Sequence, residues 1–401
     1  MNLRLLPFVV TFLAFSSAFS QETSAHSFGK GLFNLSGKDS TWSMKIGLRF
    51  QTLGLVEWTE SAEGSLEDPQ SNMLIRRSRL KFDGFAFTPD LEYKFELGLA
   101  NRDISGASEF TSNAPRYILD AVVRWRFYKN FVIWLGQTKL PGNVERIVSS
   151  GNLQLVDRSL LNSRFNIDRD MGLQLHHHFY LYDSFLVREA LAFSQGEGRN
   201  ITSGNEGGHQ YTARVELLPM GEFTKEGEYS GADLEREEEP KLMLAIAYDT
   251  NQDAVRTRSN LGSYMVNDTG LYETTINTLF MDATFKYNGI SLMAEYAHRE
   301  AHNAVARNSD GSPTGDVVLV GDALNMQAGY LFKKNWEVSG RYTHVEPEVE
   351  ITGADPESQY TLGLSKYLAG HKLKIQSDIS YLDAENNLDE MMYRLQFELH
   401  F

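Results

Sequence analysis

The sequence predicts an all-β protein: a transmembrane antiparallel β-barrel of about 16 strands. Apolar and polar residues alternate with a period of two over most of 41–401, which is typical of strands with two different faces. Many of these runs reach ten residues, beyond the ~5–6 usual in globular sheets and close to the ~9–11 that cross a bilayer. Short turns alternate with long polar connections, as in outer-membrane barrels.

Residues 1–20 have the features of a secretory signal peptide and are excluded from the fold. An apolar stretch over 5–15 follows a basic start, and small residues precede a cut between Ser20 and Gln21. We therefore expect secretion, cleavage at that bond and a short periplasmic segment over 21–40, followed by the barrel.

The alternation divides the rest of the chain into sixteen candidate strands. The last is the clearest, because one of its faces carries Tyr393, Leu395, Phe397, Leu399 and Phe401. Its other face carries Arg394, Gln396, Glu398 and His400. The expected strands are 42–57, 73–87, 91–102, 117–128, 131–138, 171–178, 185–195, 209–217, 241–249, 279–287, 290–299, 323–332, 336–345, 358–367, 371–382 and 390–401.

The lengths of the connections predict which strand ends lie together at one end of the barrel. Tight turns rich in Gly, Pro, Asn and Asp follow alternate strands, and aromatic residues such as Phe87, Tyr128 and Trp336 flank them, as an interfacial girdle would. Long polar segments join the other strand ends, at 58–72, 103–116, 139–170, 196–208, 250–278, 300–322, 346–357 and 383–389. The turn around 219–240 is the one exception to this short–long rule.

Composition excludes several classes of protein. The chain has no cysteine, which removes disulfide scaffolds and thiolate metal sites. A formal net charge of −15 argues against nucleic-acid binding. The acidity is concentrated in 57–70, 219–240, 346–357 and 383–390, so the remaining chain, including the strands, is slightly basic.

Three segments resemble the phosphate-selective porin O and P family. They are Ile75 to Gly84 (IRRSRLKFDG), Asp120 to Phe127 (DAVVRWRF) and Gly136 to Pro141 (GQTKLP), in the family's order and spacing. The resemblance is strong over about 70–180. It implies a sixteen-stranded, trimeric outer-membrane channel of a Gram-negative bacterium that favours anions, in some members phosphate or polyphosphate.

A barrel of this size encloses water, so the face turned away from lipid lines a path for solutes. We predict an anion-attracting wall on neighbouring strands, made of Arg77, Arg79, Lys81, Lys94, Arg102, Arg124 and Arg126. The alternative is mutual neutralisation, because Asp83, Glu92, Glu96 and Asp120 share those strands.

The longest connection, 139–170, is predicted to fold into the lumen as a constriction loop. Its apolar residues could pack inward: Ile147, Val148, Leu153, Leu155, Val156, Leu160 and Leu161. Arg146, Arg158 and Arg164 are the candidate constriction residues, although ion pairs that merely fix the loop to the wall would use the same side chains.

No motif indicates catalysis, a cofactor or a metal. His176, His177 and His178 lie on one strand with alternating faces, so they cannot easily close on one ion, and an interfacial role is expected. We predict passive transport of small solutes, preferring anions and including phosphate. The alternatives are a non-selective or cation-preferring pore, a plugged barrel that binds a partner protein, and an outer-membrane enzyme.

Overall fold

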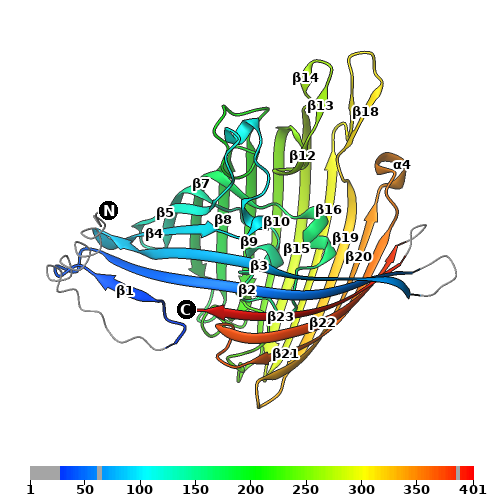
Figure 1. The fold of residues 1–401 in the computed structure, drawn as a ribbon. Coiled ribbons are helices and arrows are strands. Elements are labelled where there is room, and N and C mark those ends of the chain that lie inside the picture. The colour runs from blue at the N-terminus through cyan, green and yellow to red at the C-terminus, as the bar shows by residue number, and fades with distance from the viewer. Residues whose placement is uncertain (1–27, 61–65, 385–388) are drawn as a thin grey trace, which may run out of the picture.

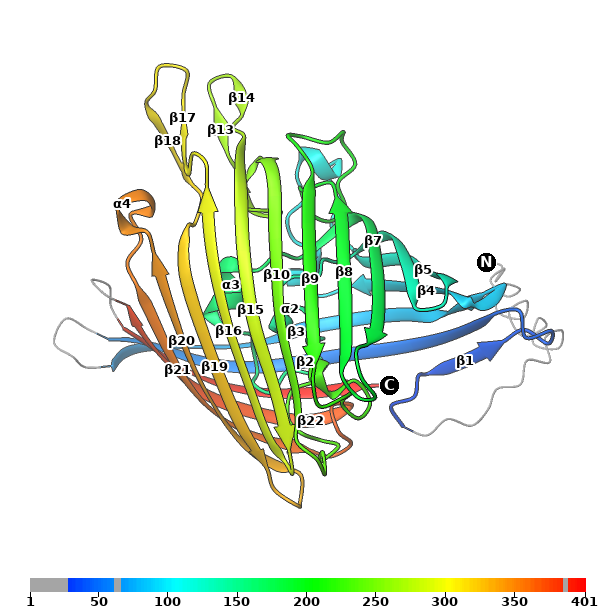
Figure 2. The same ribbon diagram turned by 180° about the vertical axis from the view of Figure 1, so that it is seen from behind.

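The computed structural model describes residues 28–60, 66–384 and 389–401, so the expected signal peptide lies outside the described residues. Within them, sixteen antiparallel strands close into a barrel, as Figures 1 and 2 show, and the predicted fold class is confirmed. The barrel strands are β2 (Ser43–Glu60), β3 (Leu66–Ala86), β4 (Thr88–Gly98), β5 (Ile118–Tyr128), β6 (Phe131–Lys139), β7 (Arg169–Tyr180), β8 (Leu186–Ser194), β9 (Gln210–Leu218), β10 (Lys241–Ala254), β15 (Thr274–Tyr287), β16 (Ile290–Ala301), β19 (Gly321–Leu331), β20 (Trp336–Pro347), β21 (Glu357–Tyr367), β22 (Leu373–Ala384) and β23 (Glu390–His400).

The first and last barrel strands pair with each other. β23 lies antiparallel to β2, with Arg49 opposite His400 and Thr59 opposite Glu390. Every one of the sixteen barrel strands therefore has two neighbours, which a sheet surrounded by lipid requires because its backbone groups have no water to bind. The segment expected to precede the barrel includes a further strand, β1 (Phe33–Ser36), which pairs with the start of β2.

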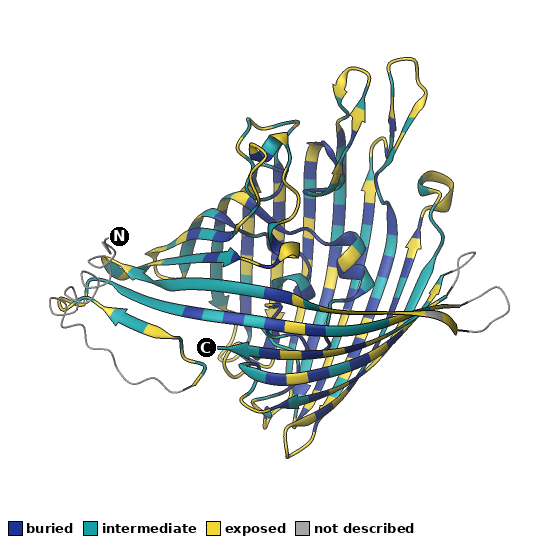
Figure 3. Cartoon of the chain, viewed as in Figure 1, coloured by how far each residue is buried: buried dark blue, intermediate teal, exposed yellow. Residues whose placement is uncertain are grey.

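Side-chain exposure alternates along the strands, as the bands in Figure 3 show. On β23, Leu395 is 48% exposed on the outer face, whereas its neighbour Gln396 is 1% exposed on the inner face. The outer face thus carries the apolar residues that lipid would cover, and the inner face carries polar ones. The described helices include none that is long and apolar enough to span a bilayer.

Three predicted loops contain more strand than the sequence indicated. Residues 58–72 were expected to be a loop, yet β2 and β3 stay paired as far as Glu60 and Leu66. The polar segments 250–278 and 300–322 also form short hairpins, two of which project beyond the barrel in Figure 1. They are β11 (Arg256–Arg258) with β12 (Leu261–Tyr264), β13 (Val266–Asn267) with β14 (Gly270–Leu271), and β17 (Val305–Arg307) with β18 (Pro313–Val317).

One predicted strand ends early. The expected strand 91–102 stops at Gly98, and Arg102 lies instead in the short helix α1 (Asn101–Ile104). The chain turns there because the Ala100 carbonyl accepts hydrogen bonds from the amides of Asp103 (2.8 Å) and Ile104 (3.1 Å). A Cβ at position 98 would lie 2.5 Å from the Cβ of Asp103, so glycine is what allows α1 to fold back. The other short helical turns are η1 (Glu109–Thr111), α2 (Val144–Ile147), α3 (Leu160–Phe165), η2 (Gly227–Tyr229) and α4 (Val349–Thr352).

Candidate functional site

The loop 139–170 between β6 and β7 crosses the inside of the barrel, as predicted. Its two short helices, α2 and α3, are joined by Glu145, whose carboxylate accepts hydrogen bonds from the amide (3.0 Å) and hydroxyl (2.5 Å) of Ser159. The Ser159 hydroxyl in turn accepts the amide of Asn162 (3.1 Å) at the start of α3. These contacts give the loop a defined internal shape.

Strands on the far side of the barrel hold this loop by hydrogen bonds. The Arg164 guanidinium donates to the carboxylate of Glu357 on β21 (2.9 Å). The Val156 amide donates to Asp378 on β22 (3.1 Å). The Glu145 amide donates to the carboxylate of Glu295 on β16 (2.8 Å). Because these partners come from three separate strands, the loop is fixed across the lumen.

Apolar packing seals the loop against the same side. Leu140, Leu161, Phe165 and Ile167 of the loop form one buried cluster with side chains on the inner faces of the strands: Ala192, Ala247, Phe280, Ala297, Ala323 and Val345. Four of these are alanines, whose small size leaves room for the loop. Of the seven loop residues predicted to pack inward, five are buried, and Ile147 and Leu160 are partly exposed.

The remaining space lies against the opposite wall, formed mainly by β3 to β9. This cavity has a volume of about 1170 Å³. Sixteen Lys and Arg but only nine Asp and Glu line it, an excess of seven positive charges. The cavity is therefore a positively charged space bounded by the strand wall on one side and by the loop on the other.

Ten of the sixteen cations form ion pairs with carboxylates among the described residues. Arg79 contacts both Glu96 and Asp103 at 3.1 Å. Lys94 contacts Glu96 at 3.0 Å and Asp120 at 2.8 Å. The predicted neutralisation across strands thus does occur at these two positions.

Asp157 on the loop gathers three more of these guanidinium groups. It lies 2.5 Å from Arg76, 3.4 Å from Arg77 and 3.5 Å from Arg394. Burial alone would raise the pKa of Asp157, but these three cations hold it below its usual range. Asp157 therefore stays ionised and ties the loop to β3 and β23.

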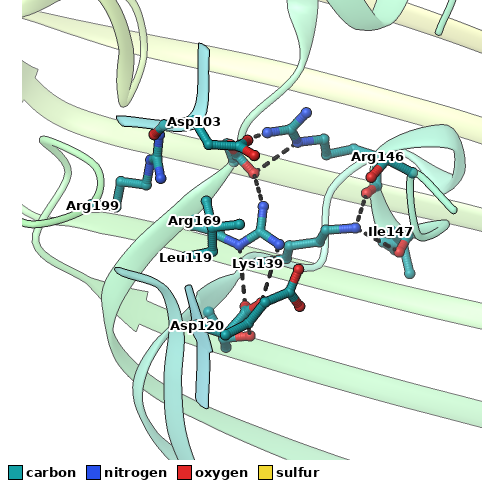
Figure 4. A network of polar contacts seen from close by, with 12 residues as sticks. Asp103, Leu119, Asp120, Lys139, Arg146, Ile147, Arg169 and Arg199 are labelled. Atoms are coloured by element: carbon teal, nitrogen blue, oxygen red, sulfur yellow. Dashed lines mark hydrogen bonds and ion pairs between the residues drawn. The ribbon is translucent and has the colours of Figure 1, made fainter. Parts of the chain in front are cut away.

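Figure 4 shows the polar network where the loop leaves and rejoins the wall. The Arg169 guanidinium donates to the Asp120 carboxylate at 3.1 and 3.2 Å, and Arg146 donates to Asp168 at 2.7 Å. Lys139 has no such carboxylate: its ammonium donates to the backbone carbonyls of residues 146–148 at 2.7, 3.0 and 3.2 Å. Burial and the neighbouring guanidinium groups of Arg158 and Arg169 hold the pKa of Lys139 well below its usual value, so these carbonyl groups, and not a carboxylate, fix its position.

Six lining cations, Lys139 among them, lack a carboxylate partner in the described part of the chain. No carboxylate of the described residues lies within 4.0 Å of Arg102, Arg124, Lys139, Arg158, Arg199 or Arg258. Burial lowers the pKa of Arg158, in the constriction loop, to about 10 and that of Arg199, in the connection between β8 and β9, to about 9. Both guanidinium groups therefore remain charged at neutral pH. The Lys139 ammonium is occupied by three carbonyl groups, so the charge available for a dissolved anion is that of the five guanidinium groups.

The structure brings most, though not all, of the predicted wall and loop residues together. Those that line the cavity are Arg77, Arg79, Lys94, Arg102, Arg124, Arg146 and Arg158. Lys81 instead pairs with Asp83 at 2.9 Å, and Arg126, with its side chain 57% exposed, lies 3.7 Å from Asp90. Arg164 is absent from the lining and pairs with Glu357 on β21.

Sequence reasoning missed Arg76, Arg199 and Arg258. Strict alternation turns Arg76 outward, but Gln51 pairs with Arg77 and Thr52 with Ile75, so Arg76 is the extra residue of a β-bulge. Its side chain is consequently buried beside that of Arg77. Two adjacent arginines that break the alternation were the available signal for this bulge.

The histidine run divides between two faces of β7, as its spacing predicted. The His176 ring stacks on Trp134, with centroids 4.1 Å apart, and the His177 ring stacks on Phe131 at 3.9 Å. Across the described residues, no three His, Asp or Glu side chains are grouped so as to hold a metal ion.

The long turn 219–240 closes part of the opposite end of the barrel, where the short turns lie. Glu228 pairs with Arg188 on β8. The ammonium of Lys286 on β15 donates to the Ser230 carbonyl (2.9 Å). The Gly231 amide donates to the carbonyl of Asn152 (2.6 Å), so this turn segment meets the constriction loop inside the barrel.

Comparisons with known proteins agree with this architecture. A sequence model of the family described as phosphate-selective porin O and P matches residues 57–394. An uncharacterized protein of Aquifex aeolicus is 22% identical over 359 residues, covering 83% of this chain and 81% of its own length.

Three solved structures illustrate the likeness of fold. Salmonella typhi OmpF in complex with daunomycin aligns with a TM-score of 0.55 at 13% identity, covering 90% of this chain and 99% of its own. The anion-selective porin from Comamonas acidovorans gives 0.52 at 11%, covering 89% and 100%. The outer membrane channel DcaP of Acinetobacter baumannii gives 0.51 at 13%, covering 91% and 99%. At these identities the likeness shows the fold alone.

Proposed function

The chain belongs to the phosphate-selective porin O and P family, and on that premise we propose that this outer-membrane channel passes small anions, inorganic phosphate among them, in preference to cations. Permeation is passive, and selectivity comes from Lys and Arg side chains in the lumen. No chemical step and no cofactor is part of this proposal.

The observation that carries the proposal is the set of five cavity arginines that have no carboxylate partner among the described residues. Fixed positive charge along a narrow aqueous path concentrates anions and excludes cations. An arginine without a carboxylate also keeps its planar fork of N–H donors, which matches the oxygen atoms of phosphate. The predicted roles of Arg102, Arg124 and Arg158 in attracting anions are part of this proposal.

Arg77, Arg79, Lys94 and Arg146 have a different role in the proposal. Each already contacts a carboxylate, so we assign them to shaping the wall and holding the loop. Their charge still contributes to the field of the cavity, because the lining has more bases than acids.

The test is the reversal potential of the purified protein in a planar lipid bilayer under a tenfold KCl gradient. We expect the sign of a chloride-preferring channel. A reversal potential with the cation-preferring sign would overturn the proposal in favour of a pore whose selectivity is set by its acidic side chains. Absence of conductance would instead support a plugged barrel, since the loop and the turn segment meet at Asn152 and Gly231.

Phosphate needs a separate measurement. Inorganic phosphate added to a KCl solution should reduce the chloride current more than an equal concentration of acetate, since phosphate carries more charge and more acceptor oxygens. Equal effects of the two anions would leave an anion channel with no phosphate preference.

Assembly and processing are also proposals. We propose that three copies associate in the membrane, as the family resemblance implies, and that the mature chain begins at Gln21. Native mass spectrometry of the protein extracted from membranes tests both. A monomeric mass would overturn the first, and an N-terminus other than Gln21 would overturn the second.

A further inference from the structure

Arg124 differs from the cations around Asp120 in its position along the barrel. It lies on β5 four residues beyond Asp120, toward the end of the barrel with the short turns, and lines the same cavity. At ~3.4 Å per strand residue, this places it about 14 Å along the strand from Asp120, which Arg169 and Lys94 bind. Arg124 is therefore nearer to the short turns than the contacts around Asp120 are.

An aromatic ring holds the Arg124 side chain in place. Trp134 is its direct neighbour on β6, and the guanidinium carbon lies 3.9 Å from the centre of the indole ring. The ring of His176 on β7 stacks on the same indole at 4.1 Å, with 24° between the two planes. Because β5 and β7 flank β6, Trp134 is enclosed between the two side chains.

No carboxylate of the described residues contacts Arg124 directly, although acidic side chains lie near it. Glu92 on β4 is directly opposite Arg124 in the strand register, yet no ion pair joins Arg124 to it or to another carboxylate of the described residues. The Nε of Arg124 is buried and has no hydrogen-bond partner there. Nε is closed off from the cavity, so the donors that an oxyanion could reach are the two terminal nitrogens of the guanidinium, which are neither buried nor hydrogen-bonded among the described residues.

We propose that Arg124 is a second anion-binding position, nearer to the short-turn end of the barrel than the contacts around Asp120, and that it takes an oxyanion such as phosphate or a carboxylate. Stacking on the indole occupies one face of the guanidinium and leaves its N–H edge for two acceptor oxygens. The inference deepens the proposed function and rests on it.

Two acids adjust the strength of this position. Glu92 lies across the strand pair, and Glu226 of the turn segment lines the same cavity. Their negative charge opposes a bound anion, so binding there is weak enough for release toward the turn end. A transport site must combine binding with release in this way.

The test is block of the chloride current by inorganic phosphate added to one side of the bilayer. Because the chain has no cysteine, a Lys333→Cys variant carries a single thiol, in the short turn between β19 and β20. An impermeant reagent that reacts with this thiol from one side of the bilayer identifies that side as the one facing the short turns, the turn-end side. In this background Arg124→Gln should weaken block from the turn-end side about tenfold, since charge-assisted hydrogen bonds are lost.

Two further variants separate binding from folding. Arg124→Lys keeps the charge but loses the planar fork, so block should weaken less than with Gln. Arg126→Gln removes a cation from the same face two residues further on, where it lies outside the cavity lining, and should leave block unchanged. If Arg124→Gln conducts like the wild type with unaltered phosphate block, the second position does not exist.

The assay also distinguishes this inference from the proposed function. A wild-type channel without anion preference would overturn the proposed function, whereas the dependence of phosphate block on Arg124 is read from the blocking concentration. Phosphate block in an anion-preferring channel that Arg124→Gln and Arg126→Gln weaken equally would overturn the inference alone.

Discussion

Replacing Arg102, Arg124 and Arg258 together by Glu should remove most of the anion preference of the pore. All three line the cavity, and none has a carboxylate within 4.0 Å among the described residues. An excess of seven charges in 1170 Å³ corresponds to a fixed-charge concentration of about 10 M. Three charge reversals leave an excess of one, or about 1.4 M, which is comparable to a concentrated salt solution.

The assay is the reversal potential under a tenfold KCl gradient. The wild type should approach the chloride limit of about 59 mV in magnitude, and the triple variant should fall below about half of that limit. Arg258 also donates to the Ser163 carbonyl of the loop, so heat-dependent migration on a gel must first show that the variant barrel still closes.

A control with the same change in charge makes the test specific. Lys81, Arg126 and Lys333 lie outside the cavity lining, and their joint replacement by Glu should shift the reversal potential by only a few millivolts. Equal shifts in the two triple variants would refute the reasoning, because total charge and not cavity charge would then set selectivity. An unchanged potential in the cavity variant would refute it as well.

Three other predictions concern the scaffold. Leu161→Ala removes a fully buried side chain from the cluster that packs the loop against the strands. It should lower the free energy of unfolding by ~2–5 kcal/mol and raise both the conductance and the current noise. A variant with unchanged stability and unchanged current noise would contradict this. Burial raises the pKa of Glu197, in a connecting loop, to about 8, above its usual 4.5. Its contribution to stability is therefore complete below pH 4.5 and is lost as the pH rises through about 8, so thermal unfolding of Glu197→Gln should lose this pH dependence, and an unchanged pH profile would exclude the residue as its source. Gly136→Ala should impair folding, because a Cβ there lies 2.1 Å from the Ala121 carbonyl oxygen at φ +131°, whereas Gly340→Ala, with its nearest atom at 3.9 Å, should be tolerated; equal refolding yields would be inconsistent with this contrast.

The strands could be predicted closely because a barrel wall separates lipid from water. A shift of one residue would turn Leu395 inward and Arg394 outward, so the alternation along β23 is strongly constrained. Where a strand extends beyond the bilayer, both faces meet water and the pattern disappears. That is why the paired ends of β2 and β3, around Thr59 and Glu67, resembled a loop in the sequence.

The candidate site was less predictable because its geometry depends on contacts distant in sequence. The bulge that turns Arg76 inward is set by pairing with β2, and Asp157, which binds it, comes 81 residues later. Nothing local distinguishes Arg158, which donates to carbonyl groups of its own loop, from Arg164, which pairs with Glu357. Sequence reasoning could identify the basic strands, but not which cations keep their charge available.

The turn segment 219–240 gives the channel a second fixed-charge layer. It carries eight acidic and two basic residues and lies at one end of a cavity whose excess charge is positive. Two layers of opposite sign in series form a junction, which should pass current more easily in one direction than in the other. The Debye length falls from ~30 Å at 0.01 M salt to ~3 Å at 1 M, so dilute salt lets the acidic layer repel anions across the whole mouth. Anion preference should then grow with ionic strength, opposite to a pore whose fixed charge has a single sign.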